Sequence, residues 1–243
     1  MRLALLAILS IGGFASQPAH GDEEKKSDST ELIEWLLAEE RDLRGIDFAQ
    51  VLAATSGKKI IPVDLVADSP WLDKLGAILD HILHGMNAPT HPVHTASRIN
   101  ETSRFIEDDL LRACNATPGW TCSIPKTAAG IEQRSGYPDL RLVLEDGSVV
   151  YLDPKLSAAE NRNSTLRTFY YEPKTGTGKV HDDARHLIVG ITHNSAAGGT
   201  LRFTGWDLID VSTLKVQLKA EFQASNKDMY RKENVIRSGR ERD

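Results

Sequence analysis

The sequence contains few cysteines, no excess of positive charge and, after its first twenty residues, no long apolar run. Two cysteines in 243 residues cannot build a disulfide framework or a four-thiolate zinc site. A formal net charge of −5 provides no overall basic field, so any contact with nucleic acid has to be local. A hydrophobic content of 40% with 18 glycines is typical of a globular protein and excludes collagen-like and low-complexity chains.

The first 21 residues predict a secretory signal peptide. A basic start precedes an apolar stretch from Leu3 to Phe14, which is too short to span a bilayer, and small and polar residues follow up to Gly21. The alternative is a buried N-terminal helix, which Pro18 would interrupt. We therefore expect an exported chain, periplasmic or secreted, with no membrane contact after the leader is removed. A mis-assigned start would instead leave the protein in the cytoplasm.

Two regions follow the leader, with an expected boundary at residues 96 and 97. Residues 22–96 carry apolar side chains at helical spacing, first over Leu32–Leu37 and again over Trp71–Leu83, which predicts a helical N-terminal region. Acidic residues outnumber basic ones over residues 22–54, and this excess would repel phosphate. The active site is therefore expected in residues 97–243.

Residues 97–243 predict an α/β fold with a mixed β-sheet flanked by helices. One helix is expected over Ile99–Ala113, and the run His186–Thr192 is nearly all apolar, as in a strand covered on both faces. The other expected strands are Trp120–Pro125, Asp139–Leu144, Ser148–Lys155 and one or two within Leu201–Phe222.

An Asp-Gly step between two apolar runs predicts a β-hairpin. A two-residue turn would place Leu140 opposite Asp153. A three-residue loop, Glu145–Gly147, would instead place Asp139 opposite Asp153, with the glycine in the left-handed conformation. We expect this second register, because it also gathers the core residues on the other face, which are Leu140, Leu142, Leu144, Val150 and Leu152.

Two carboxylates and an ammonium are then expected to converge where the two strand ends meet. Asp139 and Asp153 would repel each other and require a cation, and their oxygen atoms suit a hard divalent ion such as Mg²⁺. Lys155 follows two residues later, where it could orient a water molecule or neutralise a phosphate. Metal-assisted hydrolysis of a phosphodiester uses these groups.

The pattern Gly136-Tyr137-Pro138-Asp139, followed after thirteen residues by Asp153-Pro154-Lys155, resembles the PD-(D/E)xK nuclease superfamily. The resemblance covers about residues 97–193, or 97–230 at its widest, leaves the N-terminal helical region outside it and implies a restriction-endonuclease-like fold. The function that it implies is that of a DNA endonuclease that depends on one or two Mg²⁺ ions. Many nucleases of this superfamily dimerise to cut both strands, which makes a homodimer one option that no motif here decides.

The resemblance also implies a role for each residue of the motif. Asp139, Asp153 and the main-chain carbonyl of Pro154 would hold the metal, and Lys155 would position the attacking water. An acid on the preceding helix often completes the metal site in this superfamily; Glu107 fits best and Glu101 second. Proline departs from the usual apolar residue at position 154 and lacks an N–H group, so we expect the strand to be unpaired or bulged there.

Other interpretations remain open. The fold could be retained in a non-catalytic exported module that binds nucleic acid or another ligand. A metal-binding stress protein could use the pair His81 and His84 or the pair His91 and His94, although ordinary surface histidines are the simpler interpretation. Residues 176–179, Gly-Thr-Gly-Lys, are not a P-loop, because neither Pro173 nor Val180 fits the motif. The two cysteines could form a disulfide in an oxidising compartment or stay as buried thiols.

Overall fold

The structure, a computed structural model, describes residues 28–38, 43–96, 98, 101–165, 168–173, 176–194, 201–219, 221 and 223–238. The chain divides into two units, Met1–Arg41 and Asp42–Asp243. In the first unit, helix α1 (Asp28–Ala38) confirms the helix expected around Leu32–Leu37. The predicted signal peptide, residues 1–21, lies outside the described residues. Among the residues that are described, no helix is long and apolar enough to cross a membrane.

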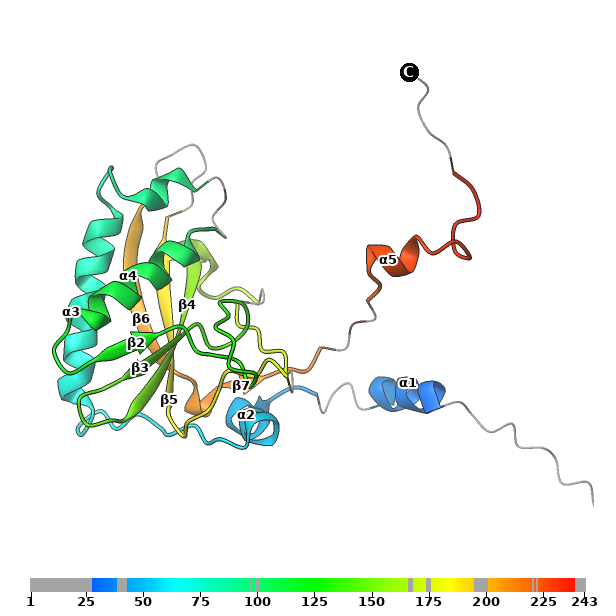
Figure 1. The fold of residues 1–243 in the computed structure, drawn as a ribbon, viewed down its shortest axis with the longest axis horizontal. Helices are drawn as coiled ribbons and strands as arrows, with labels where there is room; N and C mark the ends of the chain where they lie inside the picture. Colours follow the sequence, from blue (N-terminus) through cyan, green and yellow to red (C-terminus); the bar gives the residue numbers. More distant parts are fainter. Residues whose placement is uncertain are drawn as a thin grey trace, which may run out of the picture. The chain divides into compact units, whose positions relative to one another are not determined.

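A five-stranded mixed sheet forms the centre of the second unit (Figure 1). Its order is β2-β3-β4-β5-β6, in which β4 and β5 are parallel and all other neighbours are antiparallel. The strands are β2 (Thr121–Ser123), β3 (Leu140–Val143), β4 (Val149–Ala158), β5 (Arg185–His193) and β6 (Phe203–Asp210). A separate antiparallel pair joins β1 (Ile46–Asp47) to β7 (Lys215–Val216). The predicted α/β class with a mixed sheet is confirmed.

Helices cover both faces of the sheet. Helices α3 (Ser69–Met86) and α4 (Ser103–Asn115) pack on one face, where α4 buries Ile106, Leu110 and Cys114 at a spacing of four residues. Helix α2 (Phe48–Ser56) packs on the opposite face with side chains of β4 and β5. Short 3₁₀ turns η1 (Pro92–Thr95), η3 (Ala159–Asn161) and η4 (Val211–Thr213) and helix α5 (Asn226–Met229) complete the described elements.

Helix α3 belongs to the region that we expected to precede the nuclease core. Its Leu75, Leu79, Ile82 and Met86 are nonetheless buried in one hydrophobic cluster with α4 and the sheet. The two compact units of the chain divide between Arg41 and Asp42 and not near residue 97. The division into residues 22–96 and 97–243 stays a prediction, and the structure gives both regions a common core.

The β3–β4 hairpin has the predicted three-residue loop. Leu140 pairs with Leu152, and the main-chain N–H of Leu144 donates to the carbonyl of Ser148 at 2.9 Å. Gly147 has φ = +82°, the left-handed conformation that favours glycine. The same register places Asp139, one residue before β3, opposite Asp153 of β4.

Pro154 lies inside β4 without a bulge between β4 and β5. It pairs in regular parallel register with Val189 of β5, whereas the ladder with β3 ends at the Leu140–Leu152 pair. Hydrogen-bonded pairs alternate along an antiparallel ladder, so the main chain of Pro154 faces the β3 side, beyond the last residue of that strand. The expected bulge is therefore wrong, and the expected lack of pairing holds on the β3 side alone. Because β3 has already ended on that side, the missing N–H of Pro154 removes no hydrogen bond from the sheet.

The two cysteines are free and buried. A hydrogen bond that the Cys122 thiol donates to Cys114, reinforced by burial, raises the pKa of Cys122. The structure thus corresponds to the second of the two alternatives, a pair of buried thiols.

His186 of β5 is buried inside an aromatic cluster on the face of the sheet that α2 covers. Its Nδ1 atom is hydrogen-bonded to the Tyr137 hydroxyl at 2.7 Å, and its ring stacks on that of Tyr137. Phe48 of α2 packs edge-on against Tyr137, as does Phe169. Burial lowers the pKa of His186 to about 4, so the imidazole is neutral in the folded protein at neutral pH.

We predict that His186 makes the fold sensitive to acid. Unfolded histidine takes up a proton near pH 6.5 and the folded residue only near pH 4, so the stability contributed above pH 6.5 is lost as the pH falls toward 4. The free energy of unfolding should fall by about 2 kcal/mol more between pH 7 and pH 5 in the wild type than in His186→Asn. Urea unfolding at the two pH values measures this difference. Equal losses in both proteins would contradict the prediction.

Candidate active site

The ammonium of Lys155 lies among three oxygen atoms. Its Nζ is 3.5 Å from Oδ2 of Asp139, forms a close ion pair with Oδ2 of Asp153 and donates to the carbonyl of Pro154 at 3.3 Å. The hairpin register produces this arrangement, because it pairs Asp139 with Asp153 and places Lys155 on the same face two residues further along β4. Three oxygen atoms, one from the residue before β3 and two from the middle of β4, therefore converge on one cation.

These charged groups are largely withdrawn from water. The Asp153 side chain is 3% exposed, that of Asp139 15% and that of Lys155 25%. Burial and the neighbouring Asp139 carboxylate raise the pKa of Asp153 well above its ordinary value, although Lys155 opposes the shift. Burial alone would lower the pKa of Lys155, but the two carboxylates outweigh it and the net shift is upward. The site thus holds more negative charge than one ammonium neutralises.

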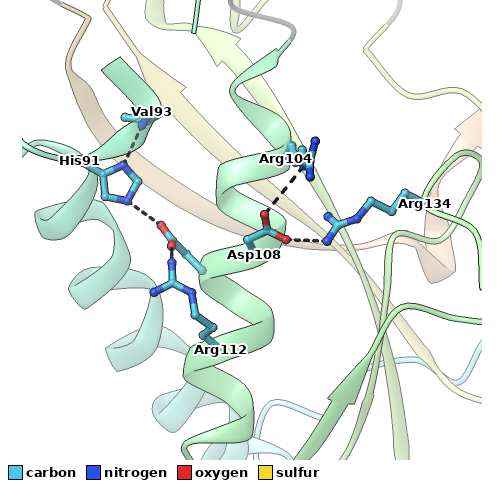
Figure 2. A network of polar contacts seen from close by, with 7 residues as sticks. His91, Val93, Arg104, Asp108, Arg112 and Arg134 are labelled. Atoms are coloured by element: carbon cyan, nitrogen blue, oxygen red, sulfur yellow. Dashed lines mark hydrogen bonds and ion pairs between the residues drawn. The ribbon is translucent and has the colours of Figure 1, made fainter. Parts of the chain in front are cut away.

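Glu107 approaches this group from α4. Burial and the charge of Asp139 raise the pKa of Glu107. The two carboxylates therefore lie within electrostatic reach of each other. Arg134, in the loop between β2 and β3, donates to Glu107 at 3.2 Å and to Asp108 at 2.6 Å. Figure 2 shows Arg134 reaching Asp108 from the loop, with Arg104 on the other side of the same carboxylate. Arg134 thus ties the Glu107 end of α4 to the loop that leads into β3.

The structure brings a further lysine to this site. Lys179 is 1% exposed and donates to the main-chain carbonyls of Gln133 and Arg134 at 3.2 and 3.4 Å. Burial lowers the pKa of Lys179, against the opposing charges of Asp139, Asp153 and Glu107. Neither Arg134 nor Lys179 was among the expected site residues. Both belong to loops, where no periodicity in the sequence indicates which way a side chain points.

Each residue of the expected motif can now be placed. Asp139, Asp153, Pro154 and Lys155 lie together, and Glu107 is bound to Arg134 within electrostatic reach of Asp139. Glu101, the second choice for the helix acid, precedes the first residue of α4, Ser103. The roles assigned to these residues stay predictions.

The available donor atoms fit a hard divalent cation. Two carboxylates and one main-chain carbonyl are oxygen ligands, and Mg²⁺ is commonly held by one or two carboxylates with water and substrate phosphate in the remaining positions. Within the described part of the chain, no three acidic, histidine or cysteine side chains are grouped closely enough to hold a metal by themselves. The fit therefore depends on the Asp139–Asp153 pair and the Pro154 carbonyl, with Glu107 outside them.

Among the histidines considered as a rival metal site, His91 has other partners. His91 contacts Asp109 of α4 at 3.0 Å and accepts a hydrogen bond from the N–H of Val93 (Figure 2). His84 lies in the last turn of α3. The described residues thus give the histidine interpretation no ligand cluster.

Comparison with known proteins places the chain in a family. The model of the type II restriction enzyme MjaV family matches residues 41–233. A type II restriction enzyme, MjaV, from Methanocaldococcus jannaschii is 33% identical over 204 residues, which are 79% of this chain and 87% of that enzyme. The chain belongs to the MjaV family of type II restriction enzymes. No solved structure matches it.

Family membership confirms the resemblance that the motif indicated, a restriction-endonuclease-like nuclease. The match to the MjaV family begins at residue 41, so it includes α2 and α3, which the sequence resemblance left outside. This range agrees with the structure, in which α3 shares the core of the sheet.

We predict that the Asp139 carboxylate lowers the free energy of unfolding of the metal-free protein and is required for divalent ions to raise it. Replacing Asp139 by Asn removes a charge that repels Asp153 and Glu107, so metal-free stability should rise by about 1 kcal/mol. Calcium at 100 times its Kd should stabilise the wild type by about 2.7 kcal/mol and Asp139→Asn far less.

Thermal unfolding with EDTA or with CaCl₂ measures both effects. The matched control is Glu160→Gln, which removes an exposed carboxylate of η3 and should respond to calcium as the wild type does. A calcium shift of equal size in Asp139→Asn and the wild type would exclude Asp139 as a ligand.

Proposed function

We propose that this chain is a Mg²⁺-dependent DNA endonuclease that hydrolyses phosphodiester bonds at the Asp139–Asp153–Lys155 site. The observation that carries the proposal is the convergence of two carboxylates and the Pro154 carbonyl on one cation at the end of a hairpin. Membership of the MjaV family supports DNA as the substrate, because the relative is a type II restriction enzyme.

Asp139, Asp153 and the carbonyl of Pro154 would hold the metal, and Glu107 would assist as an outer ligand or as part of a second ion's site. When bound, Mg²⁺ supplies an electrophile for the phosphoryl oxygen, lowers the pKa of a bound water molecule and stabilises charge on the leaving oxygen. The burial of Asp153 keeps its carboxylate from exchanging partners with bulk water and holds it in one orientation.

Lys155 contributes a mobile cation beside the carboxylates. Its ammonium has three donors on a flexible stem, so it can orient a water molecule by hydrogen bonding while it also neutralises a phosphate oxygen. Asp139 and Asp153 hold that ammonium near the reacting atoms. We assign Lys155 the positioning of the attacking water.

Contact with DNA has to be local, because the chain as a whole is acidic. Lys155 and Arg134 each keep part of the side chain exposed near the carboxylates, at 25% and 38%. We infer that the DNA backbone approaches the sheet at this end, where both cations are accessible. Since one such site cuts one strand, double-strand cleavage by a homodimer is part of the proposal.

Cleavage of supercoiled plasmid tests the proposed function. We expect residues 22–243 to nick or linearise plasmid with Mg²⁺ and to be inactive with EDTA. Asp153→Asn and Lys155→Ala should each lower the cleavage rate at least about a hundredfold, because the first removes a proposed metal ligand and the second the group proposed to position the attacking water. Lys74→Ala, which removes an exposed lysine of α3, should cleave as the wild type does.

Cleavage that persists in EDTA would overturn the metal dependence, and full activity in Asp153→Asn would overturn the site. A folded wild type that binds DNA without cutting any double-stranded or single-stranded substrate would favour the non-catalytic binding module.

Export remains a proposal for residues 1–21, and it rests on the sequence alone. We expect a bacterial host expressing the full chain to remove the leader near Gly21. Mass spectrometry of the intact protein from the periplasmic and cytoplasmic fractions measures the outcome. An unprocessed chain confined to the cytoplasm would contradict export and leave the nuclease proposal unaffected.

A further inference from the structure

Lys179 is a buried cation for which the proposed mechanism has no role. It is one of the largest fully buried side chains, with 1% of its surface exposed. No carboxylate lies within ion-pair distance of its ammonium among the residues that the structure describes. Lysine is almost never fully buried without a charged partner, and methionine would fill a similar volume without that penalty. A buried lysine at this position therefore calls for an explanation through its hydrogen bonds.

Its hydrogen bonds go to one short stretch of main chain. The ammonium donates to the carbonyl of Gln133 at 3.2 Å and to that of Arg134 at 3.4 Å. These carbonyls belong to the loop between β2 and β3, five and six residues before Asp139. Lys179 thus fixes the loop just before it enters the catalytic hairpin.

The loop in turn holds the helix acid. The Arg134 side chain donates to Glu107 at 3.2 Å and to Asp108 at 2.6 Å. A continuous series of contacts therefore runs from the Lys179 ammonium through the main chain of Arg134 to the carboxylate of Glu107. The same ammonium lies within electrostatic reach of Asp139 and Asp153.

We propose that Lys179 is a positioning residue of the metal site, which fixes the main chain at Gln133 and Arg134 so that Arg134 directs the Glu107 carboxylate toward Asp139. The proposal rests on the metal-dependent function proposed above. Lys179 acts through Arg134 and touches neither the metal nor the substrate. Outer groups of this kind orient the ligands of a metal, and their removal typically weakens metal binding by about 10- to 100-fold.

The test measures ion binding without DNA. Isothermal titration calorimetry with CaCl₂ gives the ion affinity of the DNA-free protein, and Mg²⁺ titration of plasmid cleavage gives the half-saturating concentration. Lys179→Met should weaken both by about tenfold. Lys179→Arg, which keeps the charge and the donors, should recover most of the loss. Lys74→Met, the matched removal of an exposed lysine, should leave both values unchanged.

The decisive variant is the double mutant. If Lys179 acts through Arg134, Arg134→Met alone should weaken calcium binding by about as much as Lys179→Met, and the double variant should lose no more than either one. Should Lys179→Met fail to fold, Arg134→Met alone still tests the proposal. Unchanged calcium affinity in Arg134→Met would overturn the proposal.

Two other outcomes would also overturn it. Additive losses in the double mutant would mean that Lys179 acts independently of Arg134. Unchanged calcium affinity with weaker DNA binding, and a slope of log affinity against log salt reduced by about one, would make Lys179 a phosphate contact. A wild type that neither binds calcium nor cleaves DNA would instead defeat the proposed function itself, and this result is distinct from a failure confined to the variants.

Discussion

The register of the β3–β4 hairpin is the constraint on which the site depends. Side chains alternate between the faces of a sheet, so a slip of one residue would turn Asp139 away from Asp153 and bring leucine into the polar group. Gly147, in the left-handed conformation, closes a three-residue loop that excludes this slip. On the other face the same register assembles the hydrophobic core, because Leu140, Leu142, Val150 and Leu152 all point there. One strand register therefore determines both the packing of the core and the placement of the acids.

Several charges are held in a half-buried space, and their arrangement explains how the fold tolerates them. Placing a charged group away from water costs several kcal/mol unless a partner and hydrogen bonds offset it. Each acid has such a partner: Lys155 lies between Asp139 and Asp153, and Arg134 lies against Glu107. The offset is incomplete, because burial and mutual repulsion still raise the pKa of both Asp153 and Glu107. The metal-free site is therefore electrostatically prepared for a further positive charge.

The parts of this molecule that could be predicted from sequence are those determined by local pairing. Asp139, Asp153 and Lys155 lie on one hairpin, whose loop and apolar pattern specify the register, whereas only the family resemblance pointed to Glu107 of α4. Arg134 and Lys179 could not be found in this way, because they lie in loops about 45 residues apart and meet only through the path of the chain. Phe48 is a similar case, because it contacts Tyr137 although α3 and α4 lie between the two residues in the sequence. Pro154 was recognised as a departure from the motif, but the sequence could not show which neighbouring strand would end before it.

The proline and the lysine of the motif are best understood together. Because Pro154 has no N–H and faces the side where β3 has already ended, its carbonyl is left to accept from Lys155 instead of from a neighbouring strand. A divalent ion held by the same three oxygen atoms could not share the position of the Lys155 ammonium, so binding the ion would require the ammonium to move. Lysine can make that move, because its four-carbon stem is flexible and its charge is compact, whereas the planar guanidinium of arginine is larger and directional. The group that stabilises the two carboxylates would thereby be the one released toward water and phosphate, which ties the stability of the site to the chemistry proposed for it.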